Sequence, residues 1–168
     1  MQLKGTFAKK TYRIIFMILF ILYLSILAFL TLAGRLYGGR AIYRSINIIP
    51  FATILQYLTS FVNPNIVIMN IWGNIEAFMP MGLLLPVNFG RMRKFKKVLF
   101  VVLIVTFSIE VLQYITGSGA SDIDDVILNV FGGILGYLIY RLVMILWRVI
   151  PANVKLQFLG KRTGQEHE

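Results

Sequence analysis

The chain has 168 residues, of which 58% are hydrophobic and 14% charged, and its mean hydropathy is +0.76. A soluble domain of this length has too little interior to hide so much apolar surface, so lipid must act as part of the solvent. The absence of cysteine excludes disulfides and thiolate metal sites, and the net charge of +10 lies in short segments beside apolar runs, which argues against nucleic-acid binding.

The first predicted element is a membrane span over residues 14–33, an uncharged stretch about as long as the hydrocarbon core is thick. The basic residues before it, Lys4, Lys9, Lys10 and Arg13, would also suit a signal peptide. The apolar run is longer than a typical signal-peptide core, so we interpret it as an uncleaved anchor.

The next segment, residues 42–62, is ambiguous. Its stretch from 45 to 62 has no charge but contains Asn47, Pro50 and Gln56, so it suits either a fifth span or a re-entrant or interfacial helix. A fifth span would leave only residues 63–65 to turn the chain, and it would place the basic cluster at 91–97 outside. We therefore assign the segment to the outer face.

Three further spans are predicted over residues 66–90, 98–116 and 124–148. With four spans, the basic cluster at 91–97 and the basic tail at 151–168 fall on the cytoplasmic side together with the N-terminus, which is the arrangement that the positive-inside tendency favours. The sequence thus predicts an all-α, polytopic membrane bundle in a single domain, 1–168, with both termini in the cytoplasm.

Polar residues of three predicted spans fall at similar depth near the outer end. Span three carries Glu110 and, one turn above it, Gln113, while span two carries Asn70 and Asn74 one turn apart. In span four one helical face carries polar residues at its top and glycines below, namely Asp122, Asp125, Asn129, Gly132 and Gly136.

Each of these signals also has a structural interpretation. Ser121 and Asp124 fit a capping box, and Asp122 and Asp125 sit where a helix N-terminus favours negative charge. Asn74, Gln113 and Asn129 could be hydrogen-bonding glue between helices. The glycines, Gly82 among them, suit close packing within one bundle or between protomers, and Pro80 leaves the carbonyl of Glu76 without its helical donor and favours a kink.

Glu110 is the strongest candidate for a functional role. A charged group in the bilayer costs about 2.5–3.5 kcal/mol on insertion scales, so an intramembrane carboxylate needs a partner, a water-filled cavity or a purpose. Glu110 would be a proton-carrying group, a cation ligand or a neutral hydrogen-bond donor. Glu76, beside the predicted kink, is a candidate partner.

Four motifs in order resemble those of VanZ-like membrane proteins. They are NIIPF from Asn47 to Phe51, NIEAFMPMGLLLP from Asn74 to Pro86, EVLQ from Glu110 to Gln113, and DIDDVILNVFGGILGY from Asp122 to Tyr137. The resemblance implies a multi-pass protein of the bacterial cell membrane, and it adds Asn47 to the predicted ligand-binding residues. The founding member of this family is linked to resistance to teicoplanin, a lipoglycopeptide that binds cell-wall precursors outside the membrane.

This chain departs from the family pattern in two places. Family members often have an arginine shortly before the DxxD segment, whereas this chain reads GSGAS from Gly117 to Ser121. If that arginine contacts a phosphate in other members, either Arg44 takes over that role here or the ligand differs. Glu76 occupies a position where the resemblance implies an apolar residue.

Three functions are compatible with the predicted outer polar pocket. The first is a binding or accessory protein in which Asn74, Glu110, Gln113, Asp122, Asp125 and Asn129 engage a lipid-linked peptidoglycan precursor or a lipoglycopeptide. The second is an intramembrane enzyme with Glu110 as the acid or base and Asp122 and Asp125 holding a hard divalent cation. The third is a proton-coupled transporter or flippase, which would need a dimer because four spans are few for alternating access.

The enzyme hypothesis is the weakest of the three. The only histidine, His167, lies in the polar tail, and no serine sits in a GxSxG context. The sequence predicts no cofactor, and the partners that it predicts with least ambiguity are membrane lipids.

Overall fold

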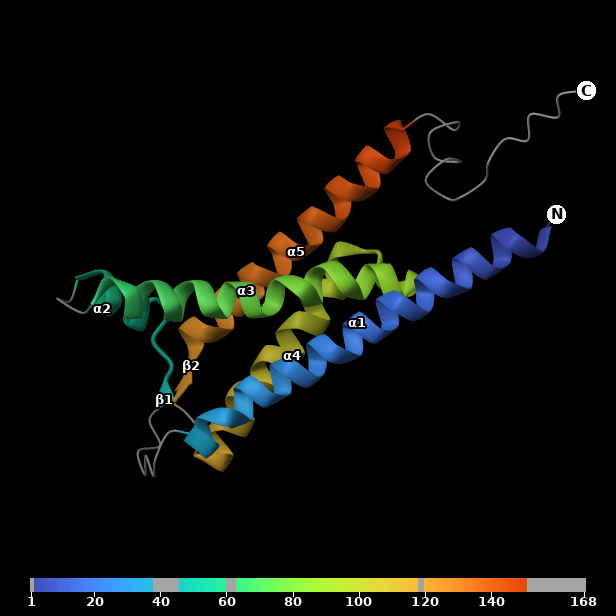
Figure 1. Ribbon diagram of the computed structural model, residues 1–168. Coiled ribbons are helices and arrows are strands. Elements are labelled where there is room, and N and C mark those ends of the chain that lie inside the picture. The colour runs from blue at the N-terminus through green and yellow to red at the C-terminus, as the bar shows by residue number, and fades with distance from the viewer. Residues whose placement is uncertain (1, 38–45, 60–62, 118–119, 151–168) are drawn as a thin grey trace, which may run out of the picture.

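The computed structural model describes residues 2–37, 46–59, 63–117 and 120–150 (Figure 1). Within the first helix, side chains are described from residue 11 to residue 31. Arg44, His167 and the basic tail at 151–168 lie outside the described residues, as do the predictions that rest on them.

Four described helices are long and apolar enough to cross a membrane, which confirms the predicted all-α architecture of four spans. Each predicted span falls within or close to one of them. They are α1 (Gln2–Tyr37), of which Thr11–Thr31 is the candidate span, α3 (Pro64–Asn88), α4 (Phe95–Thr116) and α5 (Ile123–Val149).

Helix α3 ends two residues earlier than the sequence predicted. Phe89 adopts an extended conformation, and the 3-10 helix η1 (Gly90–Met92) then turns the chain toward α4. At the other end of α3, the side chain of Asn63 accepts a hydrogen bond from the amide of Asn65, and Pro64 occupies the first turn, where its missing N–H costs nothing.

Successive spans run in opposite directions, so the bundle has two distinct ends (Figure 1). The strand end holds the starts of α3 and α5, the end of α4 and two short strands, β1 (Ile46–Asn47) and β2 (Ser121–Asp122). The η1 end holds η1, the starts of α1 and α4 and the last turns of α5.

The described part of the ambiguous segment, residues 46–59, contains β1 and a short helix, α2 (Ala52–Thr59). A helix of eight residues is only about 12 Å long, far short of the hydrocarbon thickness. The helix found in the described part of this segment is therefore too short to be a fifth span.

Glycines bring α3 and α5 into backbone contact. A Cβ atom added to Gly136 would lie 1.9 Å from the carbonyl oxygen of Met79, and one added to Gly132 would lie 2.1 Å from that of Ile75. A Cβ on Gly82 would lie 1.9 Å from the carbonyl oxygen of Gly133. Only glycine allows the two helices to approach so closely, and such close packing is a principal source of helix association in lipid.

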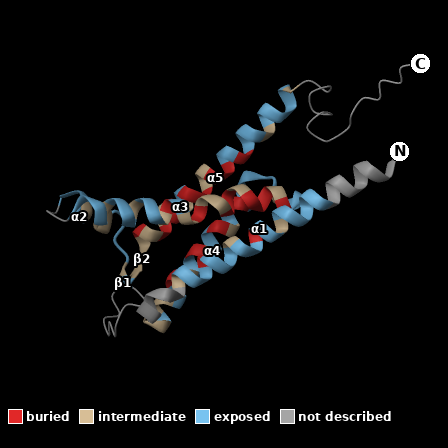
Figure 2. Cartoon of the chain, viewed as in Figure 1, coloured by how far each residue is buried: buried red, intermediate tan, exposed pale blue. Residues whose placement is uncertain are grey.

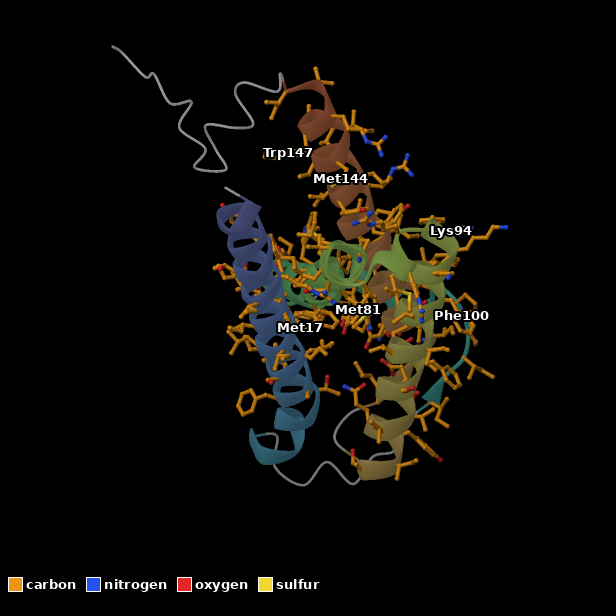
Figure 3. All side chains as sticks on the ribbon, turned by 90° about the vertical axis from the view of Figure 1, so that its right-hand side faces the viewer. Met17, Met81, Lys94, Phe100, Met144 and Trp147 are labelled. Atoms are coloured by element: carbon orange, nitrogen blue, oxygen red, sulfur yellow. The ribbon has the colours of Figure 1, made fainter. Side chains whose placement is uncertain are left out.

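The buried side chains gather where α3, α4 and α5 meet, whereas most of the described side chains of α1, residues 11–31, are exposed (Figure 2). Figure 3 shows Met81 inside the bundle and Phe100 pointing away from it. Helix α1 contributes Phe20 and Leu27 to the core, and its Tyr23 hydroxyl donates a hydrogen bond of 2.8 Å to the carbonyl of Ala77 on α3.

Candidate functional site at the strand end

A two-residue strand pairing brings distant parts of the chain together at the strand end. β1 pairs with β2 in parallel, with Ile46 opposite Ser121 and Asn47 opposite Asp122. This register places residues 46–54 over the first turn of α5. We call the contact between this segment and α5 the clasp.

Asp122 lies at the centre of the clasp. It is the N-cap of α5, because one carboxylate oxygen accepts a hydrogen bond of 2.9 Å from the amide of Asp124. The same oxygen accepts from the side-chain amide of Asn47 at 3.0 Å, and the other oxygen accepts from the Thr53 hydroxyl at 2.5 Å. Asn47 in turn donates to Thr53 at 2.9 Å, so three side chains form a closed network.

Asp124 caps a different helix from the one that it belongs to. Its side chain is 1% exposed, and its two oxygens accept hydrogen bonds from the backbone amides of Phe51, Thr53 and Ile54 at 2.5, 2.8 and 3.1 Å. These amides surround the N-terminus of α2, where a helix has free donors and favours negative charge. Asp124 therefore fixes α2 to α5.

The predicted capping box of Ser121 and Asp124 is thus wrong. Asp122 caps α5, and the side chain of Asp124 points to α2. The spacing of the acidic residues contains a signal of this role: Asp122, Asp125 and Asn129 share one helical face, whereas Asp124 lies on another and has to meet a different element.

Asn74 and Asp125 connect α3 to α5 directly below the clasp. The side-chain amide of Asn74 donates a hydrogen bond of 2.6 Å to one oxygen of Asp125. Both residues are half-buried, and the bond uses only one polar atom of each. The structure therefore brings together two of the predicted ligand-binding residues. The side-chain oxygen of Asn74 and the second carboxylate oxygen of Asp125 are not used in this bond.

Glu110 connects α4 to the clasp. Its side chain is 4% exposed, and one of its oxygens accepts a hydrogen bond of 2.9 Å from the backbone amide of Asp122. The carboxylate thus lies against the start of α5, close to Asp122 and Asp125. Glu76 does not join it, because Glu76 is exposed on α3 beside Trp72 and Gly73.

A second polar layer lies one helical turn deeper. The side-chain amide of Asn129 donates a hydrogen bond of 2.8 Å to the hydroxyl of Thr106, and both residues are buried. The carbonyl oxygen of Asn129 has no hydrogen-bond partner among the described residues. Thr106 lies four residues before Glu110 and Asn129 four residues after Asp125, so the two layers share helical faces.

Sequence reasoning did not select Thr53, Thr106 or Asp124, and it selected Gln113, which lies at the edge of this network. Gln113 is half-buried near the end of α4, and its side chain is not hydrogen-bonded to any of the other predicted site residues. Asn70 is exposed on α3.

The site is rich in hydrogen-bond acceptors. Four carboxylates gather at the strand end, and the donors that reach them are backbone amides, asparagine amides and a threonine hydroxyl. Within the described ranges no three acidic or histidine side chains converge as a metal site would require. Asp122 and Asp125, the candidate metal ligands, are instead hydrogen-bonded to groups of the protein.

Four apolar helices with a polar cluster between three of them at one end define a polytopic membrane protein. The family model described as VanZ/LLP1 matches residues 15–146, and the chain belongs to this family. It is 34% identical over 125 residues to Protein VanZ of Enterococcus faecium, an alignment that covers 72% of this chain and 70% of that protein. No solved structure matches the chain.

Proposed function

We propose that the chain is a binding or accessory protein of the bacterial cell membrane that modulates resistance to teicoplanin-type lipoglycopeptides. In this proposal residues 1–168 form a single membrane domain, and the strand end faces the outside. The ligand is a lipid-linked cell-wall precursor or the antibiotic itself. The observation that carries the proposal is the polar cluster that α3, α4 and α5 build together at the strand end.

The distribution of basic residues supports this orientation. Arg91, Arg93, Lys94, Lys96 and Lys97 all lie at the η1 end and are exposed, whereas all four carboxylates of the cluster lie at the strand end. Basic residues favour the cytoplasmic side of short connections, so the η1 end is cytoplasmic in our proposal and both termini are on that side.

The hydrogen bonds of the cluster suggest which side chains meet the ligand. Asp122 and Asp124 are occupied in holding the clasp. Glu110, Asp125 and Asn74 lie below it and retain acceptor capacity, and Gln113 lies nearby on α4. A ligand for such a surface donates hydrogen bonds, as sugar hydroxyls, ammonium groups and peptide amides do. Both the precursor and the lipoglycopeptide carry these groups.

The test is Glu110→Gln in a cell that depends on this protein for resistance. Glutamine keeps the size and one acceptor oxygen but removes the charge, so the minimum inhibitory concentration of teicoplanin is expected to fall toward that of cells without the protein. Glu76→Gln is the matched control, because it removes a carboxylate of the same type that is exposed on α3.

Full resistance in the Glu110→Gln strain would assign Glu110 a purely structural hydrogen-bonding role. The proposal as a whole is contradicted if deleting the gene changes neither teicoplanin sensitivity nor the surface binding of labelled teicoplanin.

A further inference from the structure

A second polar site lies at the opposite end of the bundle. At the η1 end a hollow of about 440 Å³ opens between the start of the α1 span and the turn that joins α3 to α4. Tyr12, Arg13 and Phe16 line it from α1, and Asn88 and Arg93 line it from the other side. None of these residues belongs to the cluster at the strand end.

Hydrogen bonds fix both walls of the hollow. The side-chain amide of Asn88 donates to the carbonyl of Phe16 at 3.2 Å and to that of Leu84 at 3.0 Å, which ties α3 to α1. The hydroxyl of Tyr137 on α5 donates to the backbone carbonyl of Arg93 at 3.0 Å. The two arginine-bearing segments are therefore attached to the bundle on either side of one opening.

The charges of Arg13 and Arg93 are not neutralised by the described part of the chain. Its only five acidic residues are the four carboxylates of the strand end and Glu76, which lies at mid-span on an exposed face of α3. Both arginines are exposed and line the same hollow. Two guanidinium groups without a carboxylate partner among the described residues attract an anion to one opening, and guanidinium binds phosphate oxygens in a bidentate manner.

The depth of the hollow suits a lipid headgroup. Arg13 lies two residues inside the start of the α1 span, and Arg93 follows the end of α3, so both lie where the apolar spans meet water. Phe16 and Val87 supply apolar surface on the side of the spans. Asn88 also keeps its carbonyl oxygen without a partner among the described residues, an acceptor for a hydroxyl group.

We propose that this hollow binds a phosphate-bearing anion, with Arg13 and Arg93 holding the phosphate oxygens and the Tyr12 hydroxyl as an additional donor. Two sources carry this chemistry: the headgroup of an anionic glycerophospholipid in the membrane, and free phosphate. Basic pockets between membrane helices at the cytoplasmic side are typical sites for such headgroups. The proposal does not depend on what the strand end binds.

The experiment measures thermal unfolding of the purified full chain in detergent during titration with a ligand. Short-chain phosphatidylglycerol, short-chain phosphatidylcholine and inorganic phosphate are titrated separately. The Arg13→Gln/Arg93→Gln variant is compared with Arg91→Gln/Lys94→Gln, which removes two charges at the same end of the bundle. Arg91 and Lys94 do not line the hollow, and Figure 3 shows Lys94 pointing away from the bundle.

Phosphatidylglycerol is expected to raise the unfolding temperature saturably, and phosphatidylcholine is not. The apparent dissociation constant should rise about tenfold or more in Arg13→Gln/Arg93→Gln and stay near that of the wild type in the control, since a hydrogen bond to a charged group is worth about one such factor. A saturable response to inorganic phosphate alone, lost in the same variant, would identify free phosphate as the ligand.

The proposal is overturned if Arg13→Gln/Arg93→Gln and the control Arg91→Gln/Lys94→Gln bind the ligand equally well. It is also overturned if the wild type responds equally to both lipids and does not respond to phosphate. If Arg13→Gln/Arg93→Gln does not fold, Arg13→Lys/Arg93→Lys serves in its place. It keeps both charges but loses the planar guanidinium groups, so weaker binding than in the wild type is still expected. Unchanged binding in this variant would overturn the bidentate contact.

Discussion

Asp124 joins two helices through a single side chain. One carboxylate satisfies three backbone amides of a segment about 70 residues earlier in the chain. Local sequence rules place an acidic residue in the first turn of a helix as a favourable partner of that same helix. The spacing of the acidic residues places Asp124 on a separate helical face, but it does not identify α2 as the element that Asp124 meets, so the sequence did not predict this contact.

Asp124→Ala is expected to destabilise the protein by roughly 2–4 kcal/mol, because it removes the acceptor of three partly buried backbone hydrogen bonds. Thermal unfolding in detergent measures the loss. Glu76→Ala removes the same charge from an exposed position on α3 and should change the unfolding temperature far less. If the two variants unfold at the same temperature, Asp124 does not hold α2 in place.

The polar residues of the spans were predictable by type but not by partner. Sequence spacing placed Asn74, Glu110 and Asp125 at similar depth, and the structure brings them to one end of the bundle. Depth follows from counting residues along a helix, whereas the choice of partner depends on how each helix is rotated about its axis. The pairing of Asn129 with Thr106 depends on this rotation, and no pattern in either segment points to it.

Among the elements, α3 and α5 form the tightest pair. Apolar length predicted both helices, and the recurrence of small residues in α5 indicated close packing. The sequence could not identify α3 as the partner, because glycine favours close approach to any helix. In the structure, Gly132 and Gly136 lie against the carbonyls of Ile75 and Met79, which identifies α3 as the partner helix.

Gly136→Ala tests the α3–α5 contact. The added methyl group would lie 1.9 Å from the carbonyl oxygen of Met79, so the helices must separate, at a cost of roughly 1–3 kcal/mol or more. Gly73→Ala is the matched control, because a Cβ there meets no atom within 4 Å and alanine favours the helix by up to about 1 kcal/mol. We expect the unfolding temperature to fall for the first variant and to stay level or rise for the second; equal falls would contradict this packing.

For the whole molecule, apolar length and the position of basic residues predicted four spans and argued against a fifth one. The short pairing between β1 and β2 was not predictable, because two residues are too few for a strand pattern. This pairing positions the clasp, so the part of the site that depends on long-range contacts was also the part that local patterns could not predict.

The proposed orientation is tested by labelling single cysteines, which is direct in a chain without native cysteine. A membrane-impermeant maleimide applied to intact cells should label Ile48→Cys, whose parent side chain is 77% exposed near the strand end, and should spare Lys94→Cys at the η1 end. After the cells are opened, both positions should react. The reverse pattern in intact cells would place the polar cluster on the cytoplasmic side.

The attachment of α1 has a consequence for how the protein is made. Two hydrogen bonds of the described part of α1 lead to Ala77 and Asn88, near the middle and the end of α3. A ribosome must therefore synthesise half of the chain before the first helix can find its partners. Until α3 has been synthesised, α1 lacks both of these partners, and only its own hydrophobicity holds it in the lipid.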